Sequence, residues 1–343
     1  MRHLYNALYV LTEDSYLSLE NDNVAVNLAD GGSRKFPLRT LEQILYFGYK
    51  GASPALLGKC AEYGISLSFY TPNGRFLARI SGRNEGNVLL RKEQYRVSDD
   101  EGRSCAIAKD FIVGKIYNSR SVLERGRRDH PLSLDTERVS ADSAELLSAA
   151  RRASSCGDLA MLRGIEGEAA GIYFAHFDDF ILQSKDYFRF DGRNKRPPRD
   201  PVNALLSFTY TLLANDCASA LESTGLDPYV GFLHRDRPGR MSLALDLMEE
   251  FRSIFADRFV LNLINNRAVN SGSFKIRENG SVLLKDDARK ALLASWQERK
   301  KTVVQHPFLG EKVPWGLLPF VQAQLLARCL RGDLERYPSF LRK

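Results

Sequence analysis

The sequence has few cysteines and no long hydrophobic run. No stretch approaches the roughly 20 apolar residues that a membrane-spanning helix needs. The first residues, MRHLYNALYVLTEDS, lack the long apolar run and small-residue cleavage site of a signal peptide. We therefore expect a cytoplasmic protein without a membrane partner. The five cysteines are widely spaced and include no CxxC pair, which argues against a zinc knuckle or a disulfide framework: Cys60, Cys105, Cys156, Cys217 and Cys329.

Length and composition are those of an ordinary globular protein. The chain has 343 residues, of which 44% are hydrophobic and 27% are charged, and its net charge is +7. This length is too great for one typical core, so we expect about two domains.

The N-terminal residues show the alternation of apolar and polar side chains that is typical of half-buried strands. The runs YLSLE and VAVNLA flank a turn at residues 20–23, LYVLT precedes them, and a hairpin is expected at residues 72–74. A short helix is predicted over residues 53–63, with Ser53 as its N-cap and Pro54 in its first turn. Residues 1–90 are therefore predicted to form a small β domain of antiparallel strands plus a short helix.

The pattern changes after the run GRNEGN, where the sequence becomes polar and charged. We place an interdomain linker at residues 91–103, followed by a larger, mostly α-helical catalytic domain at residues 104–343. A hairpin-like interruption is expected near residue 280, with its turn at Asn279 and Gly280. The expected fold class is α+β.

The run GFLHRDRPGRMSLALDLMEEFR places His234 one loop before a helix that carries three acidic residues. Leucines and other apolar residues recur there at i, i+3 and i+4, which indicates a buried helix face. At about 100° per residue, Asp246 and Glu249 are then expected on the opposite face, with Glu250 at its edge. Taken alone, this pattern is typical of a solvated helix surface beside a loop histidine.

A second segment, LRGIEGEAAGIYF, places Glu166 among glycines within a helical pattern. Glycine inside a helix costs about 0.5–1 kcal/mol relative to alanine, so its repeated use needs a reason. Either a neighbouring helix packs very close, or a bulky partner such as a nucleic-acid backbone approaches Glu166. One histidine with carboxylates from two helices is a ligand set that suits Mn²⁺ or Mg²⁺ beside a phosphate.

These residues lie in blocks that resemble a known family. The blocks are RGIEGEAAGIYF, RNKRPPRDPVNALLSFTYTLL, GFLHRDRPGRMSLALDLMEEFR and, more weakly, PFVQAQLLARCLRGDLERYPSF. In order and spacing they resemble the CRISPR-associated spacer-acquisition integrases, the metal-dependent DNA endonucleases of CRISPR adaptation. The blocks span most of the C-terminal two-thirds of the chain.

The resemblance implies a site that holds Mg²⁺ or Mn²⁺. Matched by position, the metal ligands are Glu166, His234 and Glu249, and Asp246 also belongs to the catalytic region of the family. Some members have Asp where this chain has Glu249. The adjacent Glu250 is acidic too, so it remains an alternative for the second carboxylate.

The resemblance also implies a reaction and its partners. The enzyme cleaves DNA and inserts spacer DNA into the CRISPR array by attack of a 3′-hydroxyl on a phosphodiester. Its expected partners are double-stranded DNA, as spacer precursor and CRISPR repeat, a second copy in a homodimer, and a small companion adaptation protein. A further processing nuclease is left open.

Basic segments predict where DNA binds. The segment from Lys185 to Arg199 interleaves Tyr187, Phe188 and Phe190 with basic residues, a mixture that offers stacking faces and phosphate contacts. A second basic segment covers residues 115–128. The residues predicted to contact DNA are Lys115, Arg120, Arg193, Lys195, Arg196 and Arg199.

Two other functions remain open on the sequence. In one, the chain is a DNA-binding scaffold without catalysis, and its acidic residues form a solvated surface. In the other, it is a repair nuclease that acts on branched DNA. Metal-dependent chemistry that is lost on replacing Glu166, His234 or Glu249 separates an enzyme from a scaffold.

Overall fold

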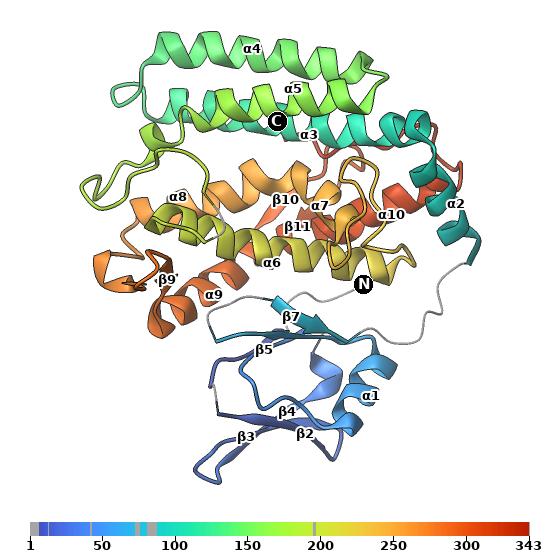
Figure 1. The fold of residues 1–343 in the computed structure, drawn as a ribbon, viewed down its shortest axis with the longest axis vertical. Helices are drawn as coiled ribbons and strands as arrows, with labels where there is room; N and C mark the ends of the chain where they lie inside the picture. Colours follow the sequence, from blue (N-terminus) through green and yellow to red (C-terminus); the bar gives the residue numbers. More distant parts are fainter. Residues whose placement is uncertain are drawn as a thin grey trace. The chain divides into compact units, whose positions relative to one another are not determined.

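The computed structural model describes residues 7–12, 14–41, 43–72, 76–80, 88–194 and 197–342. The chain divides into two compact units, one of Met1–Glu85 with Arg289–Lys301 and one of Gly86–Ala288 with Thr302–Lys343. The N-terminal unit is built on β-strands and the other is mostly helical, which confirms the predicted α+β class (Figure 1). No helix in the described ranges is long and apolar enough to cross a membrane.

The N-terminal unit contains two sheets and one α-helix of its own. One sheet has the strand order β1-β5-β6-β7 and the other the order β2-β3-β4. The elements are β1 (Ala7–Val10), β2 (Tyr16–Glu20), β3 (Asn23–Asn27), β4 (Ser33–Pro37), β5 (Gln43–Phe47), α1 (Pro54–Tyr63), β6 (Ser66–Tyr70) and β7 (Phe76–Arg79).

The strand pairing follows the prediction in one sheet and departs from it in the other. β2, β3 and β4 pair antiparallel, as expected from the turn between YLSLE and VAVNLA. β1 and β6, however, both pair parallel to β5, and only β7 is antiparallel to its neighbour β6. Parallel neighbours need a long crossover, which the β2–β4 sheet and α1 provide here. Asn73 and Gly74 of the expected hairpin lie outside the described residues.

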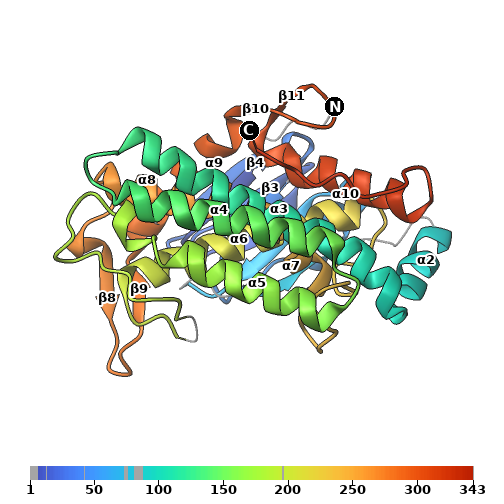
Figure 2. The same cartoon turned by 90° about the horizontal axis from the view of Figure 1, so that it is seen from above.

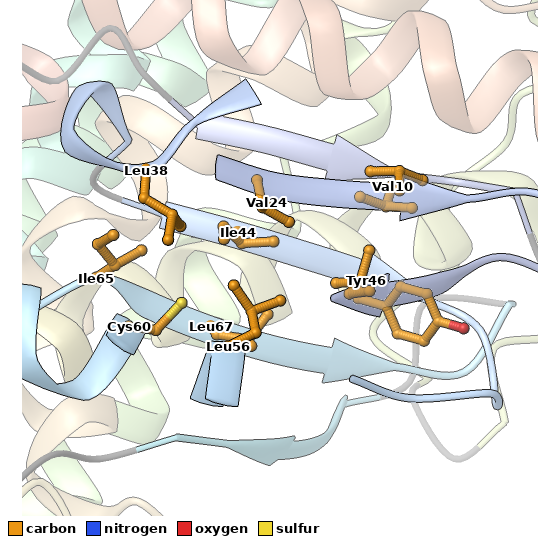
Figure 3. Close-up of a cluster of buried hydrophobic side chains, with 11 residues drawn as sticks. Val10, Val24, Leu38, Ile44, Tyr46, Leu56, Cys60, Ile65 and Leu67 are labelled. Atoms are coloured by element: carbon orange, nitrogen blue, oxygen red, sulfur yellow. The ribbon is translucent and has the colours of Figure 1, made fainter. Parts of the chain in front are cut away.

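Local signals for α1 are confirmed. The Ser53 hydroxyl accepts the amide hydrogen of Leu56, Pro54 is the first helical residue, and Gly64 ends the helix with φ 66°. α1 lies against a core of apolar side chains from both sheets, shown in Figure 3. Cys60 belongs to this core, and burial raises the pKa of its thiol to about 11. This cysteine is therefore an inert packing residue.

In the described residues, the second unit is formed by helices and four short strands that pair as β8–β9 and β10–β11. It contains α2 (Val88–Asp99), α3 (Glu101–Asp129), α4 (Thr136–Ser155), α5 (Leu159–Phe174), α6 (Pro201–Ser223), α7 (Ser242–Met248), α8 (Arg258–Asn265), β8 (Phe274–Ile276), β9 (Val282–Leu284), β10 (Val303–Gln305), β11 (Lys312–Pro314) and α10 (Leu318–Leu330). Helix α9 (Asp286–Lys301) follows β9, and its residues from Arg289 onward belong to the N-terminal unit.

Helices α3, α4 and α5 pack against one another, and Figures 1 and 2 show them side by side. Each begins at an aspartate whose carboxylate accepts an amide hydrogen of the first turn: Asp100, Asp135 and Asp158. This capping satisfies amide groups that have no partner within the helix. α5, which carries Glu166, packs against both α3 and α4.

Two further predictions, the hairpin near residue 280 and the linker at residues 91–103, concern this unit. The hairpin with its turn at Asn279 and Gly280 is confirmed as the antiparallel pair β8–β9, in which Gly280 has φ 76°. Residues 91–103, expected as a linker, form most of α2 and the beginning of α3. Polar composition in that segment therefore marks an exposed helix face.

Candidate active site

The segment with the three acidic residues changes its helical geometry along its length. After α7, a 3₁₀ turn covers Glu249–Phe251 and a π-helix covers Arg252–Asp257, before α8 begins. Departures of this kind are rare within helices and are frequent at functional sites. The angle of 100° per residue therefore does not hold across Glu249, and side-chain directions cannot be extrapolated from α7.

All three acidic residues are buried. The relative exposure is 0% for Asp246, 4% for Glu249 and 0% for Glu250. The expectation of a solvated face for Asp246 and Glu249 is therefore wrong. Its physical reason is that α3, α6 and α10 all pack on α7 or on the turn after it, so no side of this segment is left to water.

Asp246 orients His234. One carboxylate oxygen lies 2.5 Å from Nδ1 of the imidazole and also accepts the backbone amide hydrogen of His234 at 3.1 Å. The other oxygen accepts the amide hydrogens of Phe232 at 2.7 Å and Leu233 at 3.0 Å. An imidazole whose Nδ1 is held by a carboxylate presents Nε2 to its surroundings. The pair thus leaves one nitrogen of His234 available as a ligand.

The loop before His234 needs a glycine to come this close to Asp246. A β-carbon on Gly231 would lie 2.9 Å from an Asp246 carboxylate oxygen and 2.9 Å from the Ser242 backbone carbonyl carbon. Both distances are shorter than real contacts allow. Gly231 therefore permits the amide groups after it to reach the carboxylate.

Glu166 lies in the middle of α5 beside an open helix surface. Its side chain is 27% exposed. A β-carbon placed on Gly164, Gly167 or Gly171 would meet no atom within 4 Å, other than their own neighbours in the helix. Of the two explanations for these glycines, close packing of another helix does not apply here. The glycines instead leave the helix backbone around Glu166 accessible.

Lys115 of α3 connects Glu166 to Glu249. Its ammonium nitrogen contacts Oε1 of Glu166 and lies 2.8 Å from Oε2 of Glu249. On its other side, Glu249 accepts two hydrogen bonds from the Arg252 guanidinium, at 2.8 and 3.0 Å. The structure therefore brings together two of the predicted ligands, one from α5 and one from the turn after α7.

These neighbours keep Glu249 ionised. Burial acts to raise the pKa of the carboxyl, but the charges of Arg252, Lys115 and His234 outweigh it and lower the pKa to about 2. Glu249 is thus an anion in the folded protein and is linked to Glu166 through Lys115.

Glu250 points into a different environment. Its carboxyl group is bonded to the Tyr337 hydroxyl, to the Phe340 amide and to the Gln322 side chain, all near the C-terminus. The backbone carbonyl of Glu250 also accepts a hydrogen bond from Asn118. Burial raises the pKa of Glu250 to about 8 against these bonds. Glu250 therefore anchors the C-terminal tail, while Glu249 faces Glu166.

The raised pKa of Glu250 predicts a pH-dependent stability. The folded protein binds a proton that the unfolded chain, with a pKa near 4.5, releases. Stability from this group is therefore complete below pH 4.5 and is lost as the pH rises through about 8. We expect the free energy of unfolding, measured by urea denaturation, to fall by on the order of 3 kcal/mol between pH 5 and 8.

The control is Glu250→Gln, because an amide has nearly the shape of the protonated acid and can donate to the same hydroxyl. The variant is expected to lack this part of the pH dependence and to be at least as stable as the wild type at pH 8. Parallel curves for the two proteins from pH 5 to 8 would show that Glu250 is ionised in the fold. Glu249 titrates near pH 2 and does not disturb this range.

The residues predicted to contact DNA lie in different environments. Lys115 is buried between the two glutamates, and Arg120 donates to the Ser143 carbonyl on α4. Arg193 is half-buried and bonded to Asn203, whereas Arg199 is exposed. Lys195 and Arg196 lie outside the described residues. DNA contact by these six residues stays a prediction.

Two of the three aromatic residues of the same segment, Phe188 and Phe190, do not offer stacking faces. Phe188 and Phe190 are buried, at 1% and 5% exposure. Phe190 packs against Phe174 and Phe177, and Phe188 packs against Phe274. The interpretation of these two rings as a surface for bases is therefore wrong. Phe188 and Phe190 alternate with arginines because these two rings anchor the loop to the core.

Two neighbours of the site, Arg252 and Tyr210, were not predicted from the sequence. Arg252 stacks on one side on the Tyr210 ring, 4.7 Å from its centroid, and Arg193 lies 5.1 Å from the same centroid. The Tyr210 hydroxyl donates to Asp257, which is also buried. Arg252 lies three residues after Glu249. This spacing is typical of an ion pair within a helix, so the sequence could have predicted the contact. No local signal connects Lys115 to Glu166, 51 residues away.

The donors at this site fit a divalent cation. In the described part of the chain, no three His, Cys, Asp or Glu side chains stand together at metal-binding distances. The Lys115 ammonium instead occupies the space between the two carboxylates, as a cation that both accept. Carboxylate oxygens with an imidazole nitrogen are donors that Mg²⁺ or Mn²⁺ accepts. The pair of carboxylates is thus already arranged around a positive charge.

Known proteins are similar to this chain in sequence and fold. A family model described as CRISPR associated protein Cas1 matches residues 8–298. The CRISPR-associated endonuclease Cas1 1 of Chlorobaculum tepidum is 48% identical over 340 residues, 99% of each chain. A casposase bound to integration product has a similar fold, with a TM-score of 0.85, 24% identity and coverage of 98% and 94% of the two chains. A chain of a Cas6-RT-Cas1--Cas2 complex gives a TM-score of 0.80 at 21% identity, covering 99% of this chain and 36% of that one.

Proposed function

The chain belongs to the Cas1 family of CRISPR-associated proteins, and we propose that Glu166, His234 and Glu249 form the centre with which it acts on DNA. It is a DNA endonuclease and integrase of CRISPR adaptation. Nucleases of this family generally depend on a divalent metal ion. We assign Mg²⁺ or Mn²⁺ to this centre.

The observation that carries the assignment is the shared cation of Glu166 and Glu249. The two carboxylates come from different helices and meet at one ammonium group. Asp246 meanwhile holds His234 at Nδ1, which directs Nε2 away from Asp246. When bound, a divalent ion would supply Lewis-acid stabilisation of the charge that develops on a phosphate.

The protein residues have separate tasks in this proposal. Glu249 remains an anion at any neutral pH and provides a fixed negative ligand. Asp246 is a positioning residue, because it orients the imidazole without facing the substrate. Glu250 is assigned no ligand role, since its oxygens are engaged by the tail.

The open glycine surface of α5 supports the approach of DNA. Gly164, Gly167 and Gly171 leave the backbone beside Glu166 uncovered, so a sugar–phosphate chain can come close to that carboxylate. A phosphodiester placed there would lie next to the ligands. Attack by water would cleave the strand, and attack by the 3′-hydroxyl of a spacer precursor would join it to a CRISPR repeat. Only the attacking oxygen differs between the two reactions.

The burial of the acidic residues argues against a DNA-binding scaffold without catalysis. That alternative treats them as a solvated surface, whereas Asp246 and Glu249 are 0% and 4% exposed. Burying carboxylates costs desolvation free energy, which a solvated surface would not require. A repair nuclease for branched DNA would use the same centre and differs only in substrate.

The partners are proposals from related proteins. One solved structure with a similar fold is part of a complex that contains Cas2, and a relative from Geobacter sulfurreducens is a fusion of a Cas4 exonuclease with a Cas1 endonuclease. We propose that the chain assembles as a homodimer with a small companion adaptation protein of the Cas2 kind. A processing nuclease of the Cas4 kind is the further candidate partner.

The function is tested by strand transfer into supercoiled DNA that carries the CRISPR repeat, with and without the companion protein. Glu166→Gln removes one ligand charge and keeps the side-chain size. We expect this variant to lose the metal-dependent cleavage and transfer products and to bind DNA as well as the wild type. A chelator should have the same effect on the wild-type protein, and addition of Mn²⁺ should reverse it.

The matched control is Glu168→Gln on the same helix, whose carboxylate is exposed and pairs with Arg152. This variant should keep both reactions. Undiminished activity of Glu166→Gln would overturn the proposed ligand set. DNA binding that depends on salt, with no metal-dependent product from the wild type, would favour the scaffold.

A further inference from the structure

Lys115 lies at the proposed metal centre and is unusually buried for a lysine. Its side chain is only 9% exposed, although lysine is almost always found at the surface. Its ammonium reaches Glu166 of α5 and Glu249 of the 3₁₀ turn at the same time. Both contacts cross between elements that are far apart in the sequence. Lys115 therefore joins the two carboxylates as a single positive ion would.

A lysine and a divalent ion cannot share this position. The ammonium is a compact point charge whose three hydrogens are directed at oxygen acceptors. A divalent ion requires the same carboxylate oxygens, and the two positive charges repel each other at short distance. Binding of the ion thus requires the ammonium to leave at least one of the two glutamates.

Arg252 differs from Lys115 in this respect. Its guanidinium binds both oxygens of Glu249 and stacks on the Tyr210 ring. Among the described side chains its ion pair is with Glu249 and not with Glu166, and the Tyr210 ring is a second, independent partner. Arg252 can therefore stay in place and support Glu249 in either state.

A small pocket lies beside Lys115, and Arg252 is also part of its lining. The pocket is lined by residues of α3, α5 and the π-helix, among them Lys115, Ala170, Tyr173, Phe174 and Asp257. Its apolar walls suit the methylene groups of the lysine, and the Asp257 carboxylate offers an acceptor for the ammonium.

We propose that Lys115 is an internal cation that holds Glu166 and Glu249 together in the metal-free protein and competes with the divalent ion for them. This inference rests on the proposed function of the two glutamates. It makes Lys115 a positioning residue of the metal-free site. The two carboxylates are kept close and neutralised before the ion arrives, and the apparent metal affinity is reduced by the fraction of molecules in which the ammonium has left.

The test is Mn²⁺ binding, followed by the electron paramagnetic resonance of the free ion, to the full chain and its variants. Lys115→Met removes the charge and keeps most of the side-chain volume. We expect this variant to bind Mn²⁺ at least about tenfold more tightly than the wild type, because the competitor is gone. In the absence of metal it should unfold at a lower temperature, since the carboxylates then repel each other, and Mn²⁺ should raise its melting temperature by more than that of the wild type.

Lys109→Met is the matched control, because it removes one positive charge from the same helix without touching either glutamate. It should bind Mn²⁺ as the wild type does. Equal or weaker Mn²⁺ binding by Lys115→Met than by the wild type would overturn the proposal. Weaker binding would mean that Lys115 supports the ligands when the ion is present.

Glu249→Gln separates a failure of this proposal from a failure of the proposed function. If the wild-type protein binds Mn²⁺ and Glu249→Gln binds it equally well, the metal site itself is wrongly assigned. If Glu249→Gln loses binding and Lys115→Met gains none, only the role of Lys115 is wrong.

A second measurement uses the wild-type protein and does not depend on the folding of Lys115→Met. The reactivity of the Lys115 amine toward acetic anhydride can be followed by mass spectrometry with and without Mn²⁺. We expect Mn²⁺ to increase the reactivity of Lys115 severalfold in the wild type and to have no effect in Glu249→Gln. A reactivity in the wild type that Mn²⁺ leaves unchanged would contradict displacement.

Discussion

Replacing Glu249 by glutamine is expected to reduce metal-dependent strand cleavage and strand transfer by at least about a thousandfold. The variant keeps the shape of the side chain and loses the negative charge that faces Lys115, Arg252 and the proposed ion. Loss of several kcal/mol of charge stabilisation in the transition state corresponds to this factor, since each 1.4 kcal/mol is about tenfold in rate. The measurement is the initial rate of product formation at saturating Mg²⁺ or Mn²⁺.

The adjacent residue supplies a control of the same type. Glu250→Gln also exchanges a buried glutamate for glutamine, one position further along the chain, but its carboxyl group faces Tyr337 and Phe340. We expect this variant to keep activity within a fewfold of the wild type at neutral pH. A large loss in Glu250→Gln with little loss in Glu249→Gln would reverse the assignment of the second carboxylate.

Replacing Asp246 by alanine is expected to lower the free energy of unfolding by about 3–5 kcal/mol. Its side chain has no exposure to solvent, and its two oxygens accept three backbone amide hydrogens and hold the partly exposed His234 ring. Without the Asp246 oxygens, the three backbone amides lose their acceptors. Each unpaired amide costs about 1–3 kcal/mol before relaxation. Urea denaturation at pH 7 measures the loss, and Mn²⁺ binding should weaken as His234 loses its orientation.

Asp236→Ala is the control for this second prediction. Asp236 is an exposed aspartate in the loop between His234 and α7, so its removal should change stability by no more than about 0.5 kcal/mol. Asp246→Asn adds a finer comparison, because the amide keeps one acceptor for the backbone and loses the charge. If Asp246→Ala is as stable as Asp236→Ala, the hydrogen bonds to the loop do not contribute to the fold.

Local patterns account for much of the secondary structure. The N-cap and proline of α1, the antiparallel pair β2–β3 and the turn at Gly280 are all set by neighbouring residues. The same patterns do not predict that β1 and β6 lie parallel to β5, because parallel pairing depends on which crossover lies between the strands. The polar composition of residues 91–103 predicted a linker, and packing of one helix face made it helical instead.

Whether a side chain is buried depends more strongly on the tertiary fold than secondary structure does. A helix period of 100° predicted that Asp246 and Glu249 are solvated, but the turn after α7 departs from that period and other helices cover it. The same limit applies to Phe188 and Phe190, whose arginine neighbours suggested a DNA surface and whose rings are in the core. Composition shows which groups are present, whereas burial depends on segments that are distant in the chain.

By itself, the sequence determined the family, the α+β class and the candidate ligands, because these rest on residue types and their spacing within short segments. Only the tertiary structure decided that Glu249 faces Glu166 while Glu250 binds the tail, since a local change of helical geometry sets the two side chains apart. Only the tertiary structure, too, placed Lys115 between the carboxylates. An ion pair across 51 residues forms through the packing of α3 on α5 and the 3₁₀ turn, and no local pattern records it.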